Sequence, residues 1–564
     1  MKSINGTTWN IESVPERLIL KYKQNFKVSY LLSKILLEKK YTSEEIHNSL
    51  YTTEKYEIDY NNKDILKAVK LFKSATEFNN KILIFGDYDV DGYSSTYLLY
   101  DFIKKLKFNC NYYIPDRFKD GYGPNKKLLE KIVKKNNYSL VFFVDCGSNS
   151  TDEILYLEKK GTKTIIIDHH QIYNSTEFKN TVIINPLKNL KINQNLNFCS
   201  ATLVYFFLKQ LNKFFFKEKK INFDKYLFFA AISTICDQMP LRFQNKVIVK
   251  NGLSKFDINN FINIKKLINL KKKISSSDIG FNLGPCLNSS SRLGYPDLTI
   301  KLLIEKKIDN INKLSTQIIK LNEKRKNFQN ITYNHLRKKI DISKNEIIFK
   351  YHKNINEGLI GIIAANFVED YNKPCFILTK SNKLIKCSAR SIKGFDIGNI
   401  LNFALQKKII IKGGGHSMAG GCLLNSNKIY EFKIFLNEIF RKKFKKFENI
   451  KSYSSEQTLE SLKSFAKNEL QRLEPLGNDN SNPIFLIKNN KIIKYKIIKN
   501  KHLQVIIKNK FNKSCLCLAF NALDTELGYF LTNYKKQIDL IVQINNKIIQ
   551  KNSDFNLIIK DAII

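Results

Sequence analysis

Acidic side chains stand directly after four apolar runs in the first half of the chain. They occur in the segments GDYDVDG (86–92), DCG (145–147) and DHH (168–170), and as Asp237 after the run at 228–236. Carboxylates held close together repel one another and resist removal from water. A divalent cation relieves that repulsion, and oxygen ligands combined with imidazole suit Mn²⁺ or Mg²⁺ better than a structural zinc ion. The pattern therefore indicates a metal site.

Other roles are open for each of these side chains taken alone. Aspartate often caps a helix or closes a turn, and either role would explain any single one of them. His169 and His170 could likewise be ordinary surface residues. The chain has only seven histidines, however, and two of them stand side by side directly after Asp168. Four acidic groups together with this histidine pair favour one shared chemical site over independent caps.

The runs that carry the acids belong to an alternation of short apolar segments with helical patterns between residues 80 and 190. Strands that alternate with helices predict an α/β domain with a doubly wound parallel sheet. Such sheets place their functional groups at the carboxyl ends of the strands, which is where the acids stand. We expect Asp237 to follow a fourth strand in the same way.

The remainder of the chain divides into a helix, a second α/β stretch and a β-rich end. Apolar residues recur at near-helical spacing over 311–340 and predict a long connector helix. From about 484 onward, short apolar runs without a helical period predict a small β-barrel. The predicted division is an N-terminal segment at 1–60, a catalytic domain at 61–310, the connector at 311–340, a smaller α/β domain at 341–447 and a barrel domain at 448–564.

The charge balance is strongly basic, with 94 Lys and Arg against 51 Asp and Glu and a formal net charge of +43. Basic surfaces attract phosphate groups, so a polyanionic partner is one explanation. Lys, Asn, Ile, Phe and Tyr are enriched throughout the chain, however, as in translation from an A+T-rich genome. The charge alone therefore supports a nucleic-acid partner only weakly.

The ten cysteines form no CxxC pair, and most of them lie within apolar runs. This pattern is typical of buried thiols in a reducing compartment and argues against a disulfide or zinc framework. The first residues lack an apolar core of signal-peptide length, and no apolar stretch approaches the roughly 20 residues that span a bilayer. We expect a cytoplasmic protein that does not bind membranes.

In this order and spacing, the segments GDYDVDG, VDCG, IDHH and TICDQMPL resemble the four acidic motifs of the DHH superfamily of phosphoesterases. The succession of DHH core, long helix, DHHA1 domain and barrel is similar to the RecJ family within it. Further similar segments lie at 114–123, 185–186, 288–292, 388–391, 414–416 and 473–477. The resemblance covers nearly the whole chain. It implies a DHH domain, a DHHA1 domain and an OB-type barrel.

The resemblance also implies an activity, 5′→3′ exonuclease cleavage of single-stranded DNA to mononucleotides in recombination and repair. Two Mn²⁺ or Mg²⁺ ions would serve the hydrolysis, bound by Asp87, Asp89, Asp145, His169 and Asp237. Whether Asp91 is a further ligand stays open. Asp168 would orient its neighbours, and His170 would stabilise charge or transfer a proton at the scissile phosphate. For the DNA strand, the resemblance implies contacts from Arg117, Tyr122, Asn288, Arg292, Ser388, Arg390 and His416.

Three positions depart from the pattern common in the RecJ family. Cys286 and Asn366 stand where arginine is frequent, and Asn356 stands where the DHHA1 segment usually has histidine. The metal motifs are intact. We therefore expect hydrolysis to be retained while contacts to the strand are weakened.

The expected partner is single-stranded DNA, with a single-strand-binding protein as a candidate protein partner, and we expect a monomer. Two other functions remain open. One is a phosphodiesterase for short oligonucleotides or cyclic dinucleotides, for which the extra barrel would be superfluous. The other is a non-catalytic scaffold that binds single strands, against which the complete ligand set argues.

Overall fold

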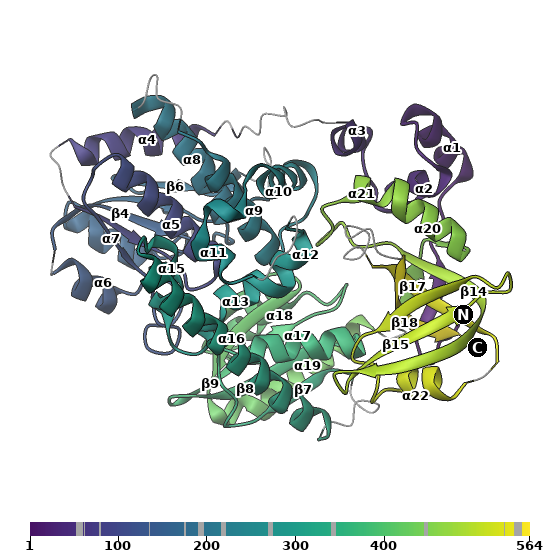
Figure 1. Cartoon of the computed structure of the whole chain (residues 1–564). Helices are drawn as coiled ribbons and strands as arrows, with labels where there is room; N and C mark the ends of the chain where they lie inside the picture. Colours follow the sequence, from purple (N-terminus) through teal and green to yellow (C-terminus); the bar gives the residue numbers. More distant parts are fainter. Residues whose placement is uncertain are drawn as a thin grey trace. The chain divides into compact units, whose positions relative to one another are not determined.

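The computed structural model describes residues 1–51, 60, 62–77, 81–134, 136–173, 176–189, 197–215, 221–268, 274–339, 346–444, 449–534, 536–545 and 555–563. The chain forms two compact units (Figure 1). The smaller consists of Met1–Ile58, Gln238–Asn251 and Glu448–Ile564, and the larger of Asp59–Asp237 and Gly252–Phe447. The predicted domain boundaries at 340/341 and 447/448 lie outside the described residues, as does residue 61 of the boundary at 60/61. The predicted domain limits stay a proposal.

The larger unit contains a five-stranded parallel sheet in the order β3-β2-β4-β5-β6. Its central strands are apolar and buried on both faces, as is usual for a parallel sheet covered by helices. The order reverses between β2 and β4, and folds of this kind bind ligands at the carboxyl ends of the strands beside that reversal. The strands are β2 (Lys81–Phe85), β3 (Cys110–Tyr113), β4 (Tyr138–Val144), β5 (Lys163–Ile167) and β6 (Thr181–Ile184).

Helices cover both faces of this sheet, which confirms the predicted doubly wound fold. On one face, α6 (Lys126–Val133) and α7 (Thr151–Lys159) bury Leu129, Ile154 and Leu157 against the sheet. The other face is covered by α4 (Lys63–Thr76), α5 (Val90–Lys105) and α8 (Ser200–Phe215), which pack on one another.

Helical segments follow, and the longest is the predicted connector. That helix is confirmed as α16, Ile308–Arg337, a 30-residue helix of the same unit. The preceding elements are η1 (Pro186–Asn189), α9 (Asp224–Cys236), α10 (Phe243–Lys255), η2 (Ile258–Asn260), α11 (Ile262–Lys265), α12 (Ser276–Asp278), η3 (Ile279–Leu283), α13 (Gly284–Leu287), α14 (Ser289–Arg292) and α15 (Pro296–Ile304).

A second sheet in the larger unit has the order β10-β11-β9-β8-β7 and is antiparallel except for the β7–β8 pair. Apolar side chains are buried on both of its faces, which matches the expected smaller α/β domain. Its elements are β7 (Ile348–Tyr351), α17 (Ile360–Tyr371), β8 (Cys375–Ser381), β9 (Leu384–Arg390), α18 (Ile397–Gln406), β10 (Lys412–Gly415), β11 (Ala419–Leu424), η4 (Ser426–Lys428) and α19 (Ile429–Lys443).

The smaller unit is built around the predicted barrel, which is confirmed. Strands β14, β15, β16, β18 and β17 pair in that order, and β14 also pairs with β17, so the barrel closes. The unit also holds α20 (Leu459–Asn468), α21 (Leu470–Leu473) and β13 (Ser455–Glu456). The barrel elements are β14 (Ile484–Ile498), β15 (His502–Lys508), β16 (Ser514–Ala519), α22 (Glu526–Asn533), β17 (Ile538–Ile544) and β18 (Asn556–Ile563).

The N-terminal residues are part of this barrel unit. Helices α1 (Glu16–Asn25), α2 (Tyr30–Glu38) and α3 (Ser43–Tyr51) follow β1 (Thr8–Ile11), which pairs in parallel with β12 (Ile450–Tyr453). The buried carboxylate of Asp561 on β18 accepts hydrogen bonds from Ser3 Oγ (2.6 Å), Trp9 Nε1 (2.8 Å) and Asn5 Nδ2 (3.0 Å). These bonds anchor the N-terminus to the last strand.

The cysteines are free thiols, and all of them are buried except Cys236, which is half-buried. This placement agrees with the thiols expected from sequence. Among the helices of the described residues, none is long and apolar enough to cross a membrane.

Candidate metal centre and phosphate-binding surface

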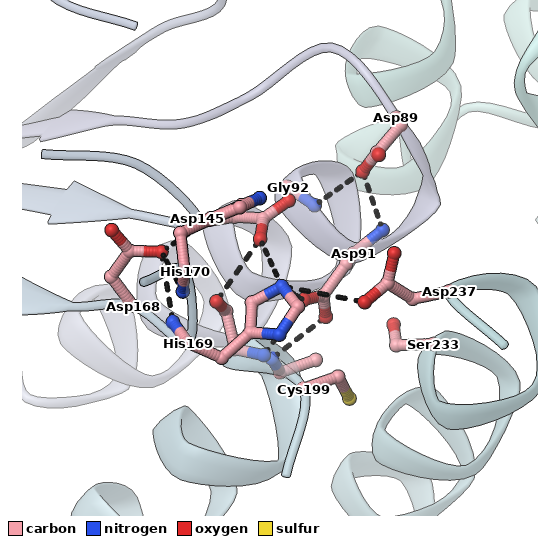
Figure 2. Close-up of polar contacts among 12 residues, drawn as sticks. Asp89, Asp91, Gly92, Asp145, Asp168, His169, His170, Cys199, Ser233 and Asp237 are labelled. Carbon is pink, nitrogen blue, oxygen red and sulfur yellow. Dashed lines mark hydrogen bonds and ion pairs between the residues drawn. The ribbon is translucent and has the colours of Figure 1, made fainter. Parts of the chain in front are cut away.

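The turn after β2 places two carboxylates at the start of α5. Asp89 is the N-cap of that helix, and its Oδ1 accepts hydrogen bonds from the amides of Asp91 (3.0 Å) and Gly92 (3.1 Å). Gly92 is needed for this close turn, because a Cβ there would lie 2.4 Å from the carbonyl oxygen of Asp87. The GDYDVDG segment therefore forms a strand-to-helix turn, with Asp89 and Asp91 at the start of α5 (Figure 2).

Asp145 lies at the carboxyl end of the neighbouring strand, β4. Its backbone is left-handed, with φ of 61°, a conformation that aspartate tolerates better than most residues. The residue is only 2% exposed, and its Oδ1 accepts a hydrogen bond from Ser200 Oγ at 3.1 Å. The β4 turn thus buries this carboxylate beside the residues that follow β2.

The His169 ring joins carboxylates from three elements (Figure 2). Its Nε2 lies 3.3 Å from Asp145 Oδ1, 3.3 Å from Asp237 Oδ2 and 3.9 Å from Asp91 Oδ2. Burial, and then the nearby charge of His170, lower the pKa of His169 to about 3. The ring is therefore neutral over the ordinary pH range, which is the form that binds metal.

Asp237 joins the cluster from a helix and not from a strand, which corrects the prediction. The run at 228–236 forms the last part of α9, and Asp237 is its C-cap, with its amide donating to Ser233 O at 2.9 Å. Residues 226–234 are all buried. A helix buried on every side has no polar face, so its sequence lacks the helical period and cannot be told from a strand.

The pKa values of the acids reflect their crowding. Burial, and then the charge of Asp89, raise the pKa of Asp87 to about 8 and that of Asp91 to about 6. Burial and the neighbouring carboxylates raise the pKa values of Asp145 and Asp237 well above their ordinary value. A cation bound among them would favour the ionised forms.

The donor atoms fit hard divalent cations. Asp87 Oδ1 is buried and has no hydrogen-bond partner among the described residues, so one coordinating oxygen remains free. All the donors are carboxylate oxygen or imidazole nitrogen, a set that suits Mn²⁺ or Mg²⁺. Three groups of such atoms lie within 4.8 Å of one another: Asp87, Asp89 and Asp145; Asp145, His169 and His170; and Asp91, His169 and Asp237.

Asp91 has a different environment from the other acids. Its two oxygens accept hydrogen bonds from the amides of Ser200 (2.7 Å) and Ala201 (2.8 Å), at the N-terminus of α8. A carboxylate is favourable at that end of a helix, where the amides have no partner within the helix. The geometry therefore favours Asp91 as a residue that positions α8 against α5 over a role as a direct ligand.

Asp168 and His170 form a pair beside the cluster. Asp168 Oδ1 accepts from His170 Nδ1 at 2.7 Å, and its Oδ2 accepts from the amide of Ser148 at 3.0 Å. Burial would raise the pKa of Asp168, but the charge and hydrogen bond of His170 outweigh it and lower that pKa. Burial would lower the pKa of His170, but Asp168 raises it to about 9. The adjacent histidines are thus held in opposite protonation states.

Tyr122 and His416 lie against the partly exposed ring of His170. Tyr122 is 51% exposed, and its hydroxyl lies 3.4 Å from His170 Nε2. The ring of His416 stacks on that of His170, with 6.0 Å between centroids. The His416 amide donates to Ala419 O at 2.8 Å inside the β10–β11 hairpin, so it is not free to bind an anion. The structure therefore brings these predicted residues together through their side chains.

Arg117 stacks on the ring of Tyr88, with its guanidinium carbon 4.2 Å from the ring centroid. Its Nε is buried and has no hydrogen-bond acceptor among the described residues. Among the described residues, the Arg117 Nε donor is therefore left without an acceptor while the guanidinium stacks on Tyr88. Asn288 also has a buried oxygen, Oδ1, without a partner in the described part of the chain.

Arg292, at the end of α14, contacts the loop before α17, and α17 in turn packs on the strand β9 that carries Ser388 and Arg390. Arg292 Nη1 donates to Gly358 O at 3.0 Å, and Arg390 Nη1 lies 3.4 Å from Ser388 Oγ. A Cβ on Gly361 would lie 3.0 Å from Ser388 Oγ, so the absence of a side chain there keeps the place open. Burial, followed by repulsion from Arg117, Arg325 and Arg390, lowers the pKa of Arg292 to about 9. The charges of these guanidinium groups, which come from different elements, thus act on Arg292.

Three family models match the chain. They are described as DHH family, N-terminal domain (residues 81–234), DHHA1 domain (344–442) and RecJ OB domain (455–561). Their order along the chain is the order of the two sheets and the barrel. The chain therefore carries a DHH, a DHHA1 and a RecJ OB domain in succession.

Curated members of the RecJ family align with most of the chain. The single-stranded-DNA-specific exonuclease RecJ of Bacillus subtilis is 27% identical over 542 residues, which cover 92% of this chain and 66% of that protein. RecJ of Haemophilus influenzae is 29% identical over 406 residues, 66% of this chain and 68% of that protein. The chain thus spans about two thirds of the length of these relatives.

A solved RecJ structure shares the fold. The crystal structure of RecJ from Thermus thermophilus in complex with Mn²⁺ matches with a TM-score of 0.80 and 19% identity. The match covers 99% of this chain and 80% of that one. At this identity the likeness concerns the fold alone.

Two of the three departures from the RecJ pattern, Cys286 and Asn356, have structural explanations of their own. Cys286 is 3% exposed and packs in an apolar cluster with Leu302, Ile311 and Ile318. The thiol therefore belongs to the core between these helices, and the loss of a strand contact at this position stays a prediction from sequence. Asn356 Oδ1 accepts from the amide of Gly358 at 2.8 Å and shapes the loop that contacts Arg292. Asn366 is half-buried on α17.

Sequence reasoning missed Arg325, which lies on α16 and is buried. A signal was present, because Arg325 continues the stripe of buried residues that includes Ile311, Ile318 and Asn322. A charged residue on the buried stripe of a predicted helix needs a partner. The amides of Ser200 and Ala201, which bind the Asp91 carboxylate, could not be predicted either, because a pattern of side chains does not reveal backbone contacts.

Proposed function

We propose that the chain is a metal-dependent exonuclease that degrades single-stranded DNA from its 5′ end to mononucleotides. The observation that carries the proposal is the buried cluster of carboxylates around His169, placed beside a cationic His170 and a group of arginines. A site that joins metal ligands to phosphate-binding cations fits phosphodiester hydrolysis. The names of the curated relatives support the same substrate.

The ligands of the proposed centre are Asp87, Asp89, Asp145, His169 and Asp237. When bound there, two Mn²⁺ or Mg²⁺ ions would activate water and stabilise negative charge on the phosphate oxygens. The chain's own contribution is to hold these side chains in place before the ions arrive. Asp89 is fixed by the α5 amides, and Asp145 by Ser200 Oγ.

His170 is proposed to act on the scissile phosphate as a cation. Asp168 binds its Nδ1 and so fixes both the ring and its protonated form. The Nε2 N–H is then left to stabilise the phosphate oxygens or to transfer a proton to the leaving oxygen. This division of roles requires the different protonation states of His169 and His170.

The polarity is proposed to come from the arginine region. Arg117, Ser388 and Arg390 offer donors suited to a terminal phosphate, because planar guanidinium groups bind phosphate through two parallel hydrogen bonds. Tyr122 is exposed and can stack on a base, while Asn288, Arg292 and His416 complete the surface for the strand. A 5′-phosphate should therefore promote cleavage.

We further propose a cytoplasmic monomer that acts in recombination and repair and that a single-strand-binding protein can recruit. The buried free cysteines support a reducing compartment. Recruitment would show as stimulation of cleavage on strands coated with such a protein.

The test is incubation with Mn²⁺ and strands labelled at one end, comparing single-stranded DNA, duplex DNA, RNA and dinucleotides. We expect mononucleotides from the 5′ end of single-stranded DNA, faster with a 5′-phosphate. Cleavage from the 3′ end of strands blocked at the 5′ end would contradict the polarity. Activity on dinucleotides alone would favour a short-oligonucleotide phosphodiesterase, and binding without cleavage would favour a scaffold.

A further inference from the structure

Arg325 is a buried cation near the middle of α16. The residue is 5% exposed, and its guanidinium donates to Asn322 Oδ1 from Nε (3.1 Å) and Nη2 (2.9 Å) and to Gln329 Oε1 from Nη1 (2.9 Å). Both acceptors are neutral amides on the same helix. No carboxylate of the described residues lies within 4.0 Å of it. A buried charge without a counterion is costly, so an external anion would relieve it.

Arg325 lies close enough to Arg292 for the two charges to repel each other. Repulsion from Arg117, Arg325 and Arg390 helps to lower the pKa of Arg292, and burial lowers the pKa of Arg325 itself. The acid that offsets Arg292 is Asp89, which belongs to the proposed metal centre. A metal ion bound to Asp89 would neutralise its carboxylate, which would then no longer offset the charge of Arg292. The arginines therefore need anions from a ligand, and a nucleic-acid strand supplies one per nucleotide.

The packing of α16 explains how Arg325 reaches this region. Helices α13 and α14, which carry Cys286 and Arg292, pack on α16, and Ser289 Oγ donates to Ile318 O at 3.4 Å. Arg325 lies two turns beyond Ile318 on the same buried stripe. It is also one of the cations near the Cys286 thiol. Positive charge at this place thus comes from the neighbouring helix and not from residue 286.

We propose that Arg325 binds a phosphate of the DNA strand, together with Arg117, Arg292 and Arg390. The inference rests on the proposed function and adds a strand contact from the connector helix. Asn322 and Gln329 act as positioning residues that hold the guanidinium plane, which lowers the entropy lost when phosphate binds. The alternative is a purely structural arginine that stabilises α16 through its amide contacts.

The test compares Arg325→Gln with Lys326→Gln, which removes the same charge from the adjacent exposed position. Binding of a fluorescent, 5′-phosphorylated oligothymidylate is followed by anisotropy over a series of NaCl concentrations, in EDTA to prevent hydrolysis. We expect Arg325→Gln to weaken binding roughly tenfold or more, as for loss of a charged hydrogen bond. The slope of log affinity against log salt should fall by about 0.7, the value for one phosphate contact on a single strand. Lys326→Gln should change affinity less than twofold.

Thermal unfolding separates the two roles. A phosphate-binding arginine can be replaced without loss of melting temperature, or with a gain, whereas a structural one cannot. If the Gln variant fails to fold, Arg325→Lys, which keeps the charge, is used in its place to compare strand affinity and melting temperature. A loss of affinity of threefold or more at an unchanged melting temperature would support the proposal. Unchanged affinity of Arg325→Gln, or of Arg325→Lys where the Gln variant does not fold, would overturn it. Failure of the unaltered chain to bind strands would instead contradict the proposed function.

Discussion

Three of the candidate ligands, Asp87, Asp145 and Asp237, are costly to the fold in the absence of ions. Their pKa values are raised, as is that of the neighbouring Asp91, and each is shifted first by burial and then by another acid. A site of this kind sacrifices stability for binding, because the same groups would be more stable in water. Substitution of a single ligand should therefore have opposite effects on binding and on folding.

Asp145→Ala is expected to abolish hydrolysis and to weaken Mn²⁺ binding by at least tenfold. Asp145→Asn, which removes the charge but tolerates the left-handed backbone, should raise the melting temperature of the metal-free chain by a few degrees, because a buried carboxylate that repels its neighbours is removed. Calorimetric titration with Mn²⁺ and thermal unfolding in EDTA measure the two effects. The control is Glu438→Ala, which removes an exposed acid from α19. Near-normal activity at saturating Mn²⁺ would exclude Asp145 as a ligand.

His170→Gln is expected to lower kcat by about 10²- to 10⁴-fold with a much smaller change in KM, the usual range for loss of a proton donor. The side chain is partly exposed and its loss should leave the fold intact. Steady-state kinetics on a 5′-phosphorylated strand provide the measurement. Asp168→Asn should reproduce most of the loss, since it removes the group that keeps His170 protonated. Equal activity of the two variants and the unaltered chain would place the proton transfer elsewhere.

At the scale of elements, the turns that follow β2 and β4 position the acids of the candidate site. The turn after β2 depends on Gly92, and the turn after β4 on a left-handed aspartate. Both were visible in the sequence as a strand followed by an acid and a glycine. Gly92→Ala should lower the free energy of unfolding by about 2–4 kcal/mol, because the Cβ would overlap the Asp87 backbone.

Urea unfolding and Mn²⁺ titration together check the Gly92 prediction, since an opened turn should lose both stability and metal affinity. Gly280→Ala is the matched control, because a Cβ there meets Ile235 at an ordinary 3.7 Å. If both variants behave alike, the turn after β2 tolerates more movement than its packing implies.

The elements also explain which predictions from sequence held and which did not. The parallel sheet, the α16 helix and the barrel were predictable, because each has its own spacing of apolar residues. Asp237 was assigned to a strand, since α9 is buried on every side and shows no helical period. Cys286 was interpreted through its neighbours in sequence, whereas its role follows from its packing on α16. Contacts between distant helices leave no local pattern.

At the scale of the whole molecule, the smaller unit combines three separate stretches of chain. The stretch at 238–251 is held there by Arg242, which forms a two-bond ion pair with Glu45 (both 2.6 Å), and by Lys246. Lys246 is 6% exposed, and burial followed by the nearby Lys250 lowers its pKa to about 7. Its charge therefore opposes folding of the unit.

This depressed pKa predicts how stability changes with pH. Between about pH 7 and the ordinary lysine pKa of 10.5, the unfolded chain binds a proton at Lys246 that the folded chain does not. The contribution of Lys246 to stability therefore rises with pH across that window and is least favourable below pH 7. Lys246→Met should stabilise the chain at pH 6.5 by on the order of 2 kcal/mol. Urea unfolding at pH 6.5 and 9.5 tests this, and an equal effect of the substitution at both values would contradict it.

The hydrogen bonds of Asp561 affect the order in which parts of the chain can fold during synthesis. Ser3, which donates to Asp561, is 558 residues away in sequence. At roughly 5–20 residues per second, a ribosome needs on the order of a minute to join the two. During that time the apolar side chains of α2, such as Leu32 and Leu36, have no barrel to pack against. The larger unit can meanwhile complete most of its core, so the residues before the larger unit wait for the barrel before they can finish packing.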